Sequence, residues 1–426
     1  MVAMYGSIIL APLLLSTVVH ATVNVKVGML HLSDCKEPPV LISKYSLLPA
    51  AQIAFETVAK RLERGVYKNF SMTHVSTDEC CTRPVRSSGA LASSMYHDDG
   101  VDAFLGPAVS PDMAAVADMA AYWNLPVLAG AATSTLLDDK TRFPTLTRAC
   151  PGMGPMVQFM TAVLRHLGLT SCAILRGLPV DVYYRRDLPD AVFAGLERNG
   201  IIVVEVYADQ FDTLDKALEK VASFSKVIFI SASPVRDIMV HAHRLGLTRG
   251  SHVFLNWIPF EHSPWQTSSQ FENNDAETVE ALKALLMMRY HVPDTPVYHA
   301  FQRELKDRQL TLYGRELGSG ENLFAAATYD AVLIYADVIN EIVAEGGDVR
   351  DGRVVTKKMW DRTFQGVTGA VRISANGDRL GVCDLVLDMT DTKKGTFDVI
   401  GTFDEATGAI IVHEPIKCLG GKAPTG

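Results

Sequence analysis

The sequence has no excess of positive charge, which limits the partners it could bind. It carries 40 lysine and arginine residues against 48 aspartate and glutamate residues, a net charge of −8 at pH 7. A general nucleic-acid binder needs a basic face, so the composition argues against a nucleic-acid partner. With 426 residues, 48% of them hydrophobic, the chain is long enough to build more than one hydrophobic core.

The sequence also lacks the motifs of the common enzyme classes. It has no Gly-x-Ser-x-Gly elbow, no His-Glu-x-x-His zinc motif, no Cys-x-x-Cys pair and no Gly-Lys-Ser/Thr phosphate loop. His241 and His243 are two residues apart, so on a helix they would not share a face for a metal ion. We therefore expect no catalytic site, no metal and no cofactor, apart from the chloride ion considered below.

Long apolar runs are almost missing from the chain. Ile8–Val19 is nearly all apolar and Val19-His20-Ala21 fits the cleavage rule, so residues 1–21 are predicted to be a secretory signal peptide, with a buried N-terminal helix as the alternative. No later segment is expected to approach the ~20 apolar residues of a membrane span. Residues 416–426 are predicted to be a polar juxtamembrane tail. We therefore expect a secreted protein or the extracellular face of the plasma membrane, reached only through a span outside this chain.

Cysteine is scarce as well, with seven residues. In an exported chain this number predicts disulfides and one thiol left over. Cys35 with Cys80 or Cys81 is the first choice, because all three lie near the ends of early predicted elements. Cys150 and Cys172 are not expected to pair, since the helix predicted between them would hold its ends ~20 Å apart. Cys172, at the head of an apolar strand, is expected to be a buried free thiol.

What the chain does contain is a regular alternation of strand-like and helix-like segments. A first set runs from the strand 23–30 to the strand 127–128, and a second set from the helix 153–167 to the strand 252–257. Alternation of this kind predicts an α/β fold with doubly wound, mainly parallel sheets covered by helices on both faces. Two successive sets predict two lobes. The single glycosylation sequon, at Asn69, suits an exported protein.

The later part of the chain has the pattern of an antiparallel meander. Phe364-Gln365-Gly366-Val367-Thr368-Gly369 contains two glycines that allow the backbone to turn sharply. Asn376-Gly377 supplies the residues of a type I′ hairpin, and alternating runs around Leu385 and Phe397 follow. We therefore predict a continuous meander near the end of the chain.

These residues carry a family resemblance. The chain resembles the membrane-distal ligand-binding domain of natriuretic peptide receptors and their receptor guanylate cyclase relatives in a spaced series of motifs: Trp360, Phe364-Gln365-Gly366-Val367-Thr368-Gly369, Gly377-Asp378-Arg379, Asp388-Met389, Gly395-x-Phe397, Phe104-Leu105-Gly106-Pro107 and Thr147-Arg148-Ala149. The resemblance extends over roughly residues 23–403. It implies a two-lobed type I periplasmic-binding-protein-like fold, and a homodimer that captures a peptide between the membrane-side lobes of its protomers.

The resemblance also implies how the chain is divided between the lobes. Residues 22–148 and about 276–352 are expected to form the first, membrane-distal lobe. Residues 149–275 and about 353–415 are expected to form the second, membrane-proximal lobe. In this division the segment around Met359 carries the chain back into the second lobe.

The dimer contact of such receptors comes from the helices beside the Phe-Leu-Gly-Pro strand. The residues expected there are Met95, Tyr96, Met119, Tyr122 and Trp123. Exposed aromatic side chains are good interface anchors. The alternative is that Trp123 and Met119 only cover the sheet.

Relatives also hold a chloride ion with a hydroxyl and two backbone N–H groups. Ser76 or Thr77 could supply the hydroxyl, and Ala108 and Val109 the N–H groups. Where the family has a cysteine after Phe-Leu-Gly-Pro this chain has Ala108-Val109, so the disulfide partner that relatives give the position of Cys81 is missing.

The hormone-contacting positions differ in charge from those of relatives. Arg83 and Arg142-Phe143 stand where the resemblance implies an acid and an acidic-aromatic pair, and Glu205 and Tyr207 where it implies histidine and acid. Because charge reversal repels the original partner, we expect a ligand other than a cationic natriuretic hormone, a peptide with acidic or aromatic determinants.

Three functions remain open. The first is the sensor domain of a receptor guanylate cyclase, and the second is a secreted or clearance-type binding protein that only sequesters its ligand. The third is a small-molecule receptor that uses the segment Ala131-Ala132-Thr133-Ser134-Thr135.

Overall fold

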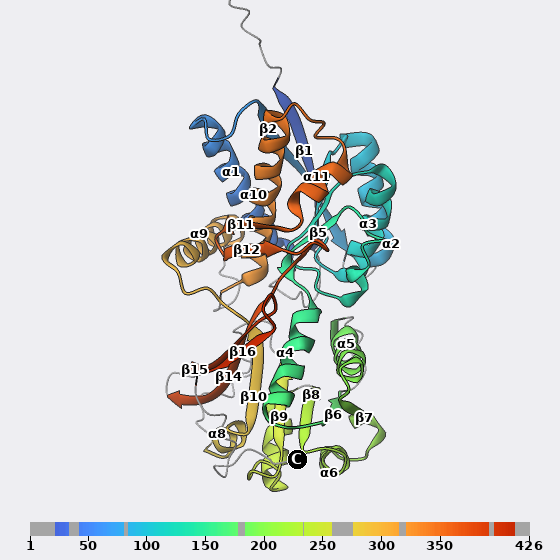
Figure 1. Ribbon diagram of the computed structural model, residues 1–426, viewed down its shortest axis with the longest axis vertical. Coiled ribbons are helices and arrows are strands. Elements are labelled where there is room, and N and C mark those ends of the chain that lie inside the picture. The colour runs from blue at the N-terminus through green and yellow to red at the C-terminus, as the bar shows by residue number, and fades with distance from the viewer. Residues whose placement is uncertain are drawn as a thin grey trace, which may run out of the picture.

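The computed structural model describes residues 22–33, 42–80, 84–177, 184–232, 234–257, 276–314, 321–391 and 396–413. This part of the chain forms two lobes stacked end to end, each built on an eight-stranded sheet (Figure 1). The predicted signal peptide, Cys35, Cys81, Arg83 and the tail 416–426 lie outside the described residues.

The first sheet has the strand order β11-β12-β13-β5-β4-β3-β1-β2. Neighbours from β2 to β5, and β13 with β5, are parallel, whereas β11, β12 and β13 pair antiparallel. The strands are β1 Val23–Ser33, β2 Phe70–Cys80, β3 Ala103–Leu105, β4 Val127–Ala129, β5 Leu146–Pro151, β11 Arg362–Gly366, β12 Gly369–Ile373 and β13 Asp378–Arg379.

Helices cover both faces of this sheet, as the alternating pattern predicted (Figure 1). One face packs against α1 Lys44–Glu63 and α10 Leu323–Ala344, and α9 Pro296–Tyr313 lies against these two helices. The other face packs against α2 Pro84–Ser94, the π-helical turn η2 Met95–Asp99 and α3 Ser110–Trp123. The short turn η3 Thr135–Asp138 follows β4, and α11 Gly352–Met359 precedes β11.

The second sheet has the order β16-β15-β14-β10-β9-β8-β6-β7, in which β14, β15 and β16 form an antiparallel meander. Its strands are β6 Ser171–Arg176, β7 Ile202–Tyr207, β8 Val227–Ser231, β9 Val253–Trp257, β10 Leu285–Tyr290, β14 Val382–Asp391, β15 Thr396–Asp404 and β16 Ala409–Val412. One face is covered by α4 Met153–His166 and α5 Tyr184–Arg198, the other by η4 Ala208–Gln210, α6 Leu214–Ala222, α7 Val235–Arg244 and α8 Ala276–Leu282.

Three stretches of the described chain pass between the lobes and touch one another. They are Pro151–Gly152 between β5 and α4, residues 291–295 between β10 and α9, and Leu380–Gly381 between β13 and β14. The Tyr290 hydroxyl donates to the Gly152 carbonyl oxygen over 3.0 Å. One hydrophobic core cluster extends through this neck, so the lobes are joined by packed side chains as well as by chain.

The structure differs from the expected division of the chain at two points. Residues 276–290 were expected in the first lobe, but β10 pairs with β9 and β14 in the second sheet. Residues 362–379 were expected in the second lobe, but β11, β12 and β13 extend the first sheet. The predicted meander is therefore split, and the chain crosses between the lobes at Leu380–Gly381. The turn at Asn376-Gly377 also differs from type I′, because only Gly377 has a positive φ.

The helix α10 corrects the expectation about membrane spans. In the described part of the chain it is the one helix long and apolar enough to cross a membrane, with a mean hydropathy of 1.3. However, 89% of that apolar window is buried inside the protein. A helix that is apolar on all sides and surrounded by α1, β2 and β5 is a core helix of the first lobe.

Three cysteines of the described region are free thiols. Cys150, Cys172 and Cys383 are buried free thiols, and burial raises the pKa of Cys172 to about 12. The expectation of a buried free thiol at Cys172 is confirmed. Cys80 ends β2, and its disulfide with Cys35 stays a prediction because Cys35 lies outside the described residues.

Candidate functional site

The β11–β12 turn, which contains the Gly366-Val367-Thr368-Gly369 motif, encloses a buried carboxylate of α10. The N–H of Val367 donates to Asp330 Oδ1 over 2.7 Å and the N–H of Thr368 to Oδ2 over 3.2 Å, while the Thr368 hydroxyl also donates to Oδ2. Asp330 has no exposed surface, and this burial raises its pKa. A Cβ on Gly366 would lie 2.3 Å from the carboxyl group, so the first glycine is required by close approach. The motif therefore anchors the first sheet to its core helix.

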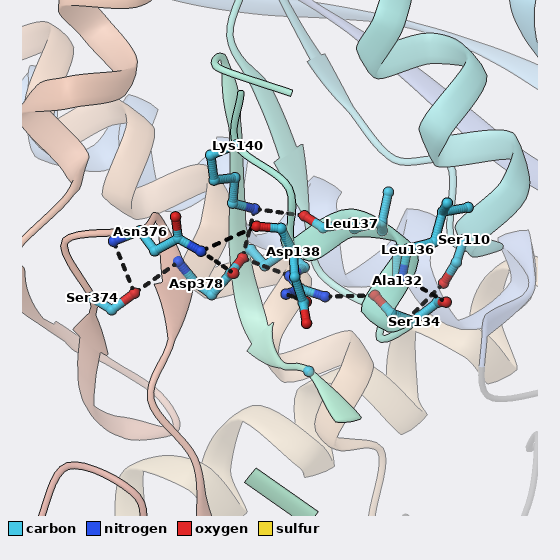
Figure 2. A network of polar contacts seen from close by, with 12 residues as sticks. Ser110, Ala132, Ser134, Leu136, Leu137, Asp138, Lys140, Ser374, Asn376 and Asp378 are labelled. Atoms are coloured by element: carbon cyan, nitrogen blue, oxygen red, sulfur yellow. Dashed lines mark hydrogen bonds and ion pairs between the residues drawn. The ribbon is translucent and has the colours of Figure 1, made fainter. Parts of the chain in front are cut away.

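A second cluster of motif residues lies at the neck, around Arg148 on β5. Its Nε donates to Asp378 Oδ1 over 2.6 Å, its Nη1 to the Ser134 carbonyl over 2.9 Å, and its Nη2 to Asp138. Lys140 donates to the same Asp378 oxygen over 2.7 Å. Figure 2 shows Asn376, from the β12–β13 turn, and Asp378, at the start of β13, facing Asp138 and Lys140, which come from the chain after β4. We call Asp138, Lys140, Arg148 and Asp378 the neck network.

The two cationic side chains of the neck network are almost completely buried. The side chains of Arg148 and Lys140 are 2% and 6% exposed. Burial lowers the pKa of Lys140 to about 8, although the Asp378 carboxylate opposes the shift. Trp360 supports the network, because its Nε1 donates to Thr147 Oγ1 over 2.9 Å and its ring fills the space that a Cβ on Gly377 would need. The network thus connects segments more than 200 residues apart, directly beside the crossings.

The segment considered for a small ligand is used internally. The Ser134 N–H donates to Ser110 Oγ, its carbonyl accepts from Arg148, and its Oγ accepts from the Leu136 N–H. Asp187 of α5, on the second lobe, lies near enough to the Ser134 hydroxyl for this group to oppose the burial that raises the pKa of Asp187. Since Ser134 is 4% exposed, the polar groups of this segment serve the neck. Ser110 is the first residue of α3, and Val109 is the N-cap of that helix.

A further ionic cluster lies at the carboxyl ends of β6 and β7, on the second lobe. Arg176 Nε donates to Glu205 Oε1 over 2.6 Å and its Nη2 to Asp190 Oδ1 over 2.5 Å. The guanidinium also lies over the Tyr207 ring, 5.4 Å from its centre. Tyr207 is 36% exposed. Glu205 and Tyr207, both predicted ligand contacts, are therefore brought together with Arg176, a residue that the sequence reasoning missed.

The predicted contacts of the first lobe are placed differently. Phe143 has no exposed surface and belongs to a core cluster, so the prediction that it touches a ligand is wrong in this structure. Arg142 Nε and Nη2 bond to the two oxygens of Asp118 over 3.0 and 2.7 Å, so its charge is already paired. Arg83 lies outside the described residues.

The predicted dimer residues share one face, with one exception. Tyr96 of η2 stacks on Trp123 of α3 with ring centres 4.4 Å apart. Tyr122 is 89% exposed, and Met119 is half-buried. Met95 is 3% exposed and lies in the core, so it offers no contact surface, contrary to expectation. Met95 therefore belongs to the core, and the other four predicted dimer residues reach the surface.

The predicted chloride ligands lie on two strands separated by a third. Thr77 of β2 is opposite Leu30 of β1, and Ala108 and Val109 follow β3 on the other side of β1. Ser76 is exposed. Two strand spacings are about 10 Å, so an ion held by all these groups would have to sit over the end of β1. The chloride site stays a prediction. Asn69, the predicted glycosylation site, is exposed at the start of β2.

Comparison with known proteins identifies the fold and the family. The family described as "Receptor family ligand binding region" matches residues 46–392. The chain belongs to this family. Atrial natriuretic peptide receptor 2 of Homo sapiens is 30% identical over 400 residues, 88% of this chain and 37% of the receptor. Atrial natriuretic peptide receptor 3 of Rattus norvegicus is 29% identical over 326 residues, 74% of this chain and 60% of the receptor. The chain thus spans less than two thirds of these relatives.

Solved structures show the same fold at low identity. A substrate-binding protein of an ABC transporter from Desulfitobacterium hafniense, in complex with leucine, has a TM-score of 0.59 and 19% identity, and covers 88% of this chain and 99% of its own. A leucine-binding protein from Thermotoga maritima has a TM-score of 0.58 and 20% identity, covering 91% and 99%. The predicted type I periplasmic-binding-protein-like fold of this receptor ligand-binding region is confirmed.

The family motifs have a structural role in this receptor ligand-binding region. Gly366 packs against Asp330, and Gly377 packs against Trp360 beside the neck. Arg148 and Asp378 form the centre of the neck network. The sequence signals of Arg148 and Asp378 were present in the Thr-Arg-Ala and Gly-Asp-Arg motifs, but nothing in the sequence paired them. No cluster of metal ligands exists among the described residues.

Proposed function

We propose that this chain is the extracellular sensor region of a natriuretic-peptide-receptor-like receptor guanylate cyclase. In this proposal a homodimer binds a peptide and transmits a change in lobe orientation to the membrane. The observation that carries the proposal is family membership over residues 46–392 together with two lobes joined by a packed ionic neck. A clearance-type binding protein would use the same ligand-binding region without signalling.

A small-molecule receptor is less well supported. The leucine-binding proteins share only the fold with this chain, at 19–20% identity. The Thr133–Thr135 segment that would line such a site already directs the Ser134 polar groups into the neck. A peptide ligand that contacts the outer surface around Arg176 and Tyr207 needs none of these groups.

We expect the purified region to form a homodimer through the face that carries Tyr96, Tyr122 and Trp123. Tyr122→Asp should weaken dimerisation at least tenfold, because an exposed aromatic anchor is replaced by a charge that must lose its water. Val66→Asp is the matched control, since Val66 is also an exposed apolar residue, 60% accessible, away from this face. Light scattering at micromolar concentrations, with and without reductant, measures the molar mass. A monomeric wild type, or a Tyr122→Asp protein that dimerises normally, would contradict the dimer.

We also expect the region not to bind a cationic natriuretic peptide with nanomolar affinity, roughly −12 kcal/mol. Phe143 is buried and Arg142 is paired with Asp118, so neither provides the acidic-aromatic contact that the resemblance implied. The repulsion expected from charge reversal now depends on Arg83 alone. Calorimetric titration with atrial natriuretic peptide tests this, with the matching region of the rat receptor 3 as positive control. Nanomolar binding would show that the ligand class was predicted wrongly.

A further inference from the structure

The turn between β15 and β16 extends from the second lobe onto the third crossing. The Glu405 side-chain Oε2 accepts from the N–H of Gly381 over 2.8 Å, and the Glu405 N–H donates to the Gly381 carbonyl over 3.0 Å. Gly381 is thus held through both of its backbone polar groups by one residue. On its other side Gly381 contacts Pro155 of α4, where an added Cβ would lie only 2.8 Å from the proline Cβ.

The neighbouring residue of this turn forms an ion pair between the lobes. Arg372 lies on β12 of the first sheet, and its Nη2 donates to Asp404 Oδ1, at the end of β15 in the second sheet, over 2.9 Å. The Arg372 carbonyl accepts from the Leu380 N–H over 2.8 Å. Both side chains are about one third exposed, so the pair alone contributes little. Together Asp404 and Glu405 contact β12 and the crossing that follows it.

We propose that the β15–β16 turn is a latch between the lobes, in which Glu405 is the proton-sensitive element that holds Gly381. Val382 pairs with Asp404 in the β14–β15 ladder, so the Gly381 carbonyl stays with the second lobe. The Gly381 N–H instead lies in the peptide plane shared with Leu380, whose own N–H is bonded to Arg372 of the first sheet. A rotation of the lobes that bends the chain at Gly381 must therefore break the hydrogen bond from Gly381 to Glu405 Oε2. The latch does not depend on which ligand the protein binds.

The groups that face Glu405 come from several elements. Gln158 of α4 approaches Oε1 over 3.4 Å. Asp378, Arg148 and Asp138 of the neck network act on it electrostatically, the two carboxylates against its ionisation and the arginine in favour. Cys383 of β14 and Tyr290 of β10 are the uncharged titratable neighbours. His291 donates its backbone N–H to the carbonyl of Val382, the first residue of β14, and pairs its ring with Asp384 over 2.9 Å.

The direction of the pH effect follows from this environment. Burial raises the pKa of Glu405 from 4.5 to about 7, although the hydrogen bond from Gly381 opposes the shift. In an opened latch the carboxyl group would meet water and return toward 4.5. The closed latch therefore binds the proton more tightly, so closure is favoured at mildly acidic pH and is lost as the pH rises through about 7. With these two pKa values the opening equilibrium increases about tenfold between about pH 6 and pH 8.

Hydrogen exchange at the Gly381 amide measures the latch directly. Exchange of the whole purified region is followed by mass spectrometry at residue resolution, and each rate is divided by the rate of an unfolded peptide at the same pH. The wild-type protection factor is expected to fall about tenfold from about pH 6 to pH 8. Glu405→Gln, which keeps the shape but cannot ionise, should show no such fall.

Two further variants separate Glu405 from its neighbours. His291→Gln removes the other titrating group beside the crossing and should retain the tenfold fall. Asp404→Asn removes the ion pair to Arg372 and should lower protection at every pH without changing its slope. A pH-independent wild type, or a Glu405→Gln protein with the full fall, would overturn the proposal.

Discussion

Replacing Arg148 by methionine is expected to lower the free energy of unfolding by about 2–3 kcal/mol, below the roughly 3–5 kcal/mol that a fully unpaired buried charge costs. Methionine retains much of the apolar stem but leaves the Asp378 and Asp138 carboxylates without the guanidinium that bonds to both. The Ser134 carbonyl would also lose its donor. Lys140 remains beside Asp378, so the loss is less than that of a completely unpaired buried charge. Urea unfolding of the purified region measures the change.

The matched control for this substitution is Arg244→Met. Like Arg148, Arg244 donates two hydrogen bonds to carboxylate oxygens, here the two oxygens of Glu277 over 2.8 Å each, but its side chain is 59% exposed. An ion pair exposed to this extent contributes about 0–1 kcal/mol. Asp378→Asn should also destabilise the protein, and combined with Arg148→Met it should cost less than the sum of the two, because both remove one interaction. Equal effects of Arg148→Met and Arg244→Met would contradict the role assigned to the neck network.

Replacing Asp330 by alanine is expected to destabilise the protein by roughly 3 kcal/mol or more. The substitution leaves the N–H groups of Val367 and Thr368 and the Thr368 hydroxyl without their acceptor, in a place from which water is excluded. Each buried polar group that loses its partner costs about 1–3 kcal/mol. Asp330→Asn keeps one acceptor oxygen and should lie between alanine and wild type. Thermal and urea unfolding both measure whether stability falls in the order wild type, Asp330→Asn, Asp330→Ala.

Asp351→Ala is the comparison at the surface. Asp351 also accepts from a backbone N–H, that of Val354, as the N-cap of α11, but it is only partly buried. Loss of such a cap costs about 0.5–2 kcal/mol. Gly366→Ala tests the same contact from the side of the β11–β12 turn. The added Cβ would meet the Asp330 carboxyl group, and such overpacking should destabilise the protein by about 1–3 kcal/mol. An Asp330→Ala protein as stable as Asp351→Ala would show that the turn does not depend on this carboxylate.

These predictions concern residues whose motifs were visible in the sequence but whose partners were not. Arg148 and Asp378 are 230 positions apart, and Asp330 and Val367 are 37 apart. Hydrophobic periodicity reports only which face of an element is buried, so it identified neither pair. Phe143 shows the same limit, because it was expected at a ligand-binding surface and is packed in the core. Arg142 was expected to present a free charge, yet Asp118 on the neighbouring helix pairs with it.

The sequence by itself determined the elements of this protein, their alternation and therefore the two-lobed α/β architecture. The helix expected at 153–167 is α4 Met153–His166, and the strand expected at 252–257 is β9 Val253–Trp257, because local periodicity and turn residues act within a few positions. Only the tertiary structure decided that β10 joins the second sheet, that β11–β13 join the first, and that the crossing falls at Gly381. Strand pairing is settled by contacts between distant segments and by which buried groups find hydrogen-bond partners, and neither is written in any one stretch of chain.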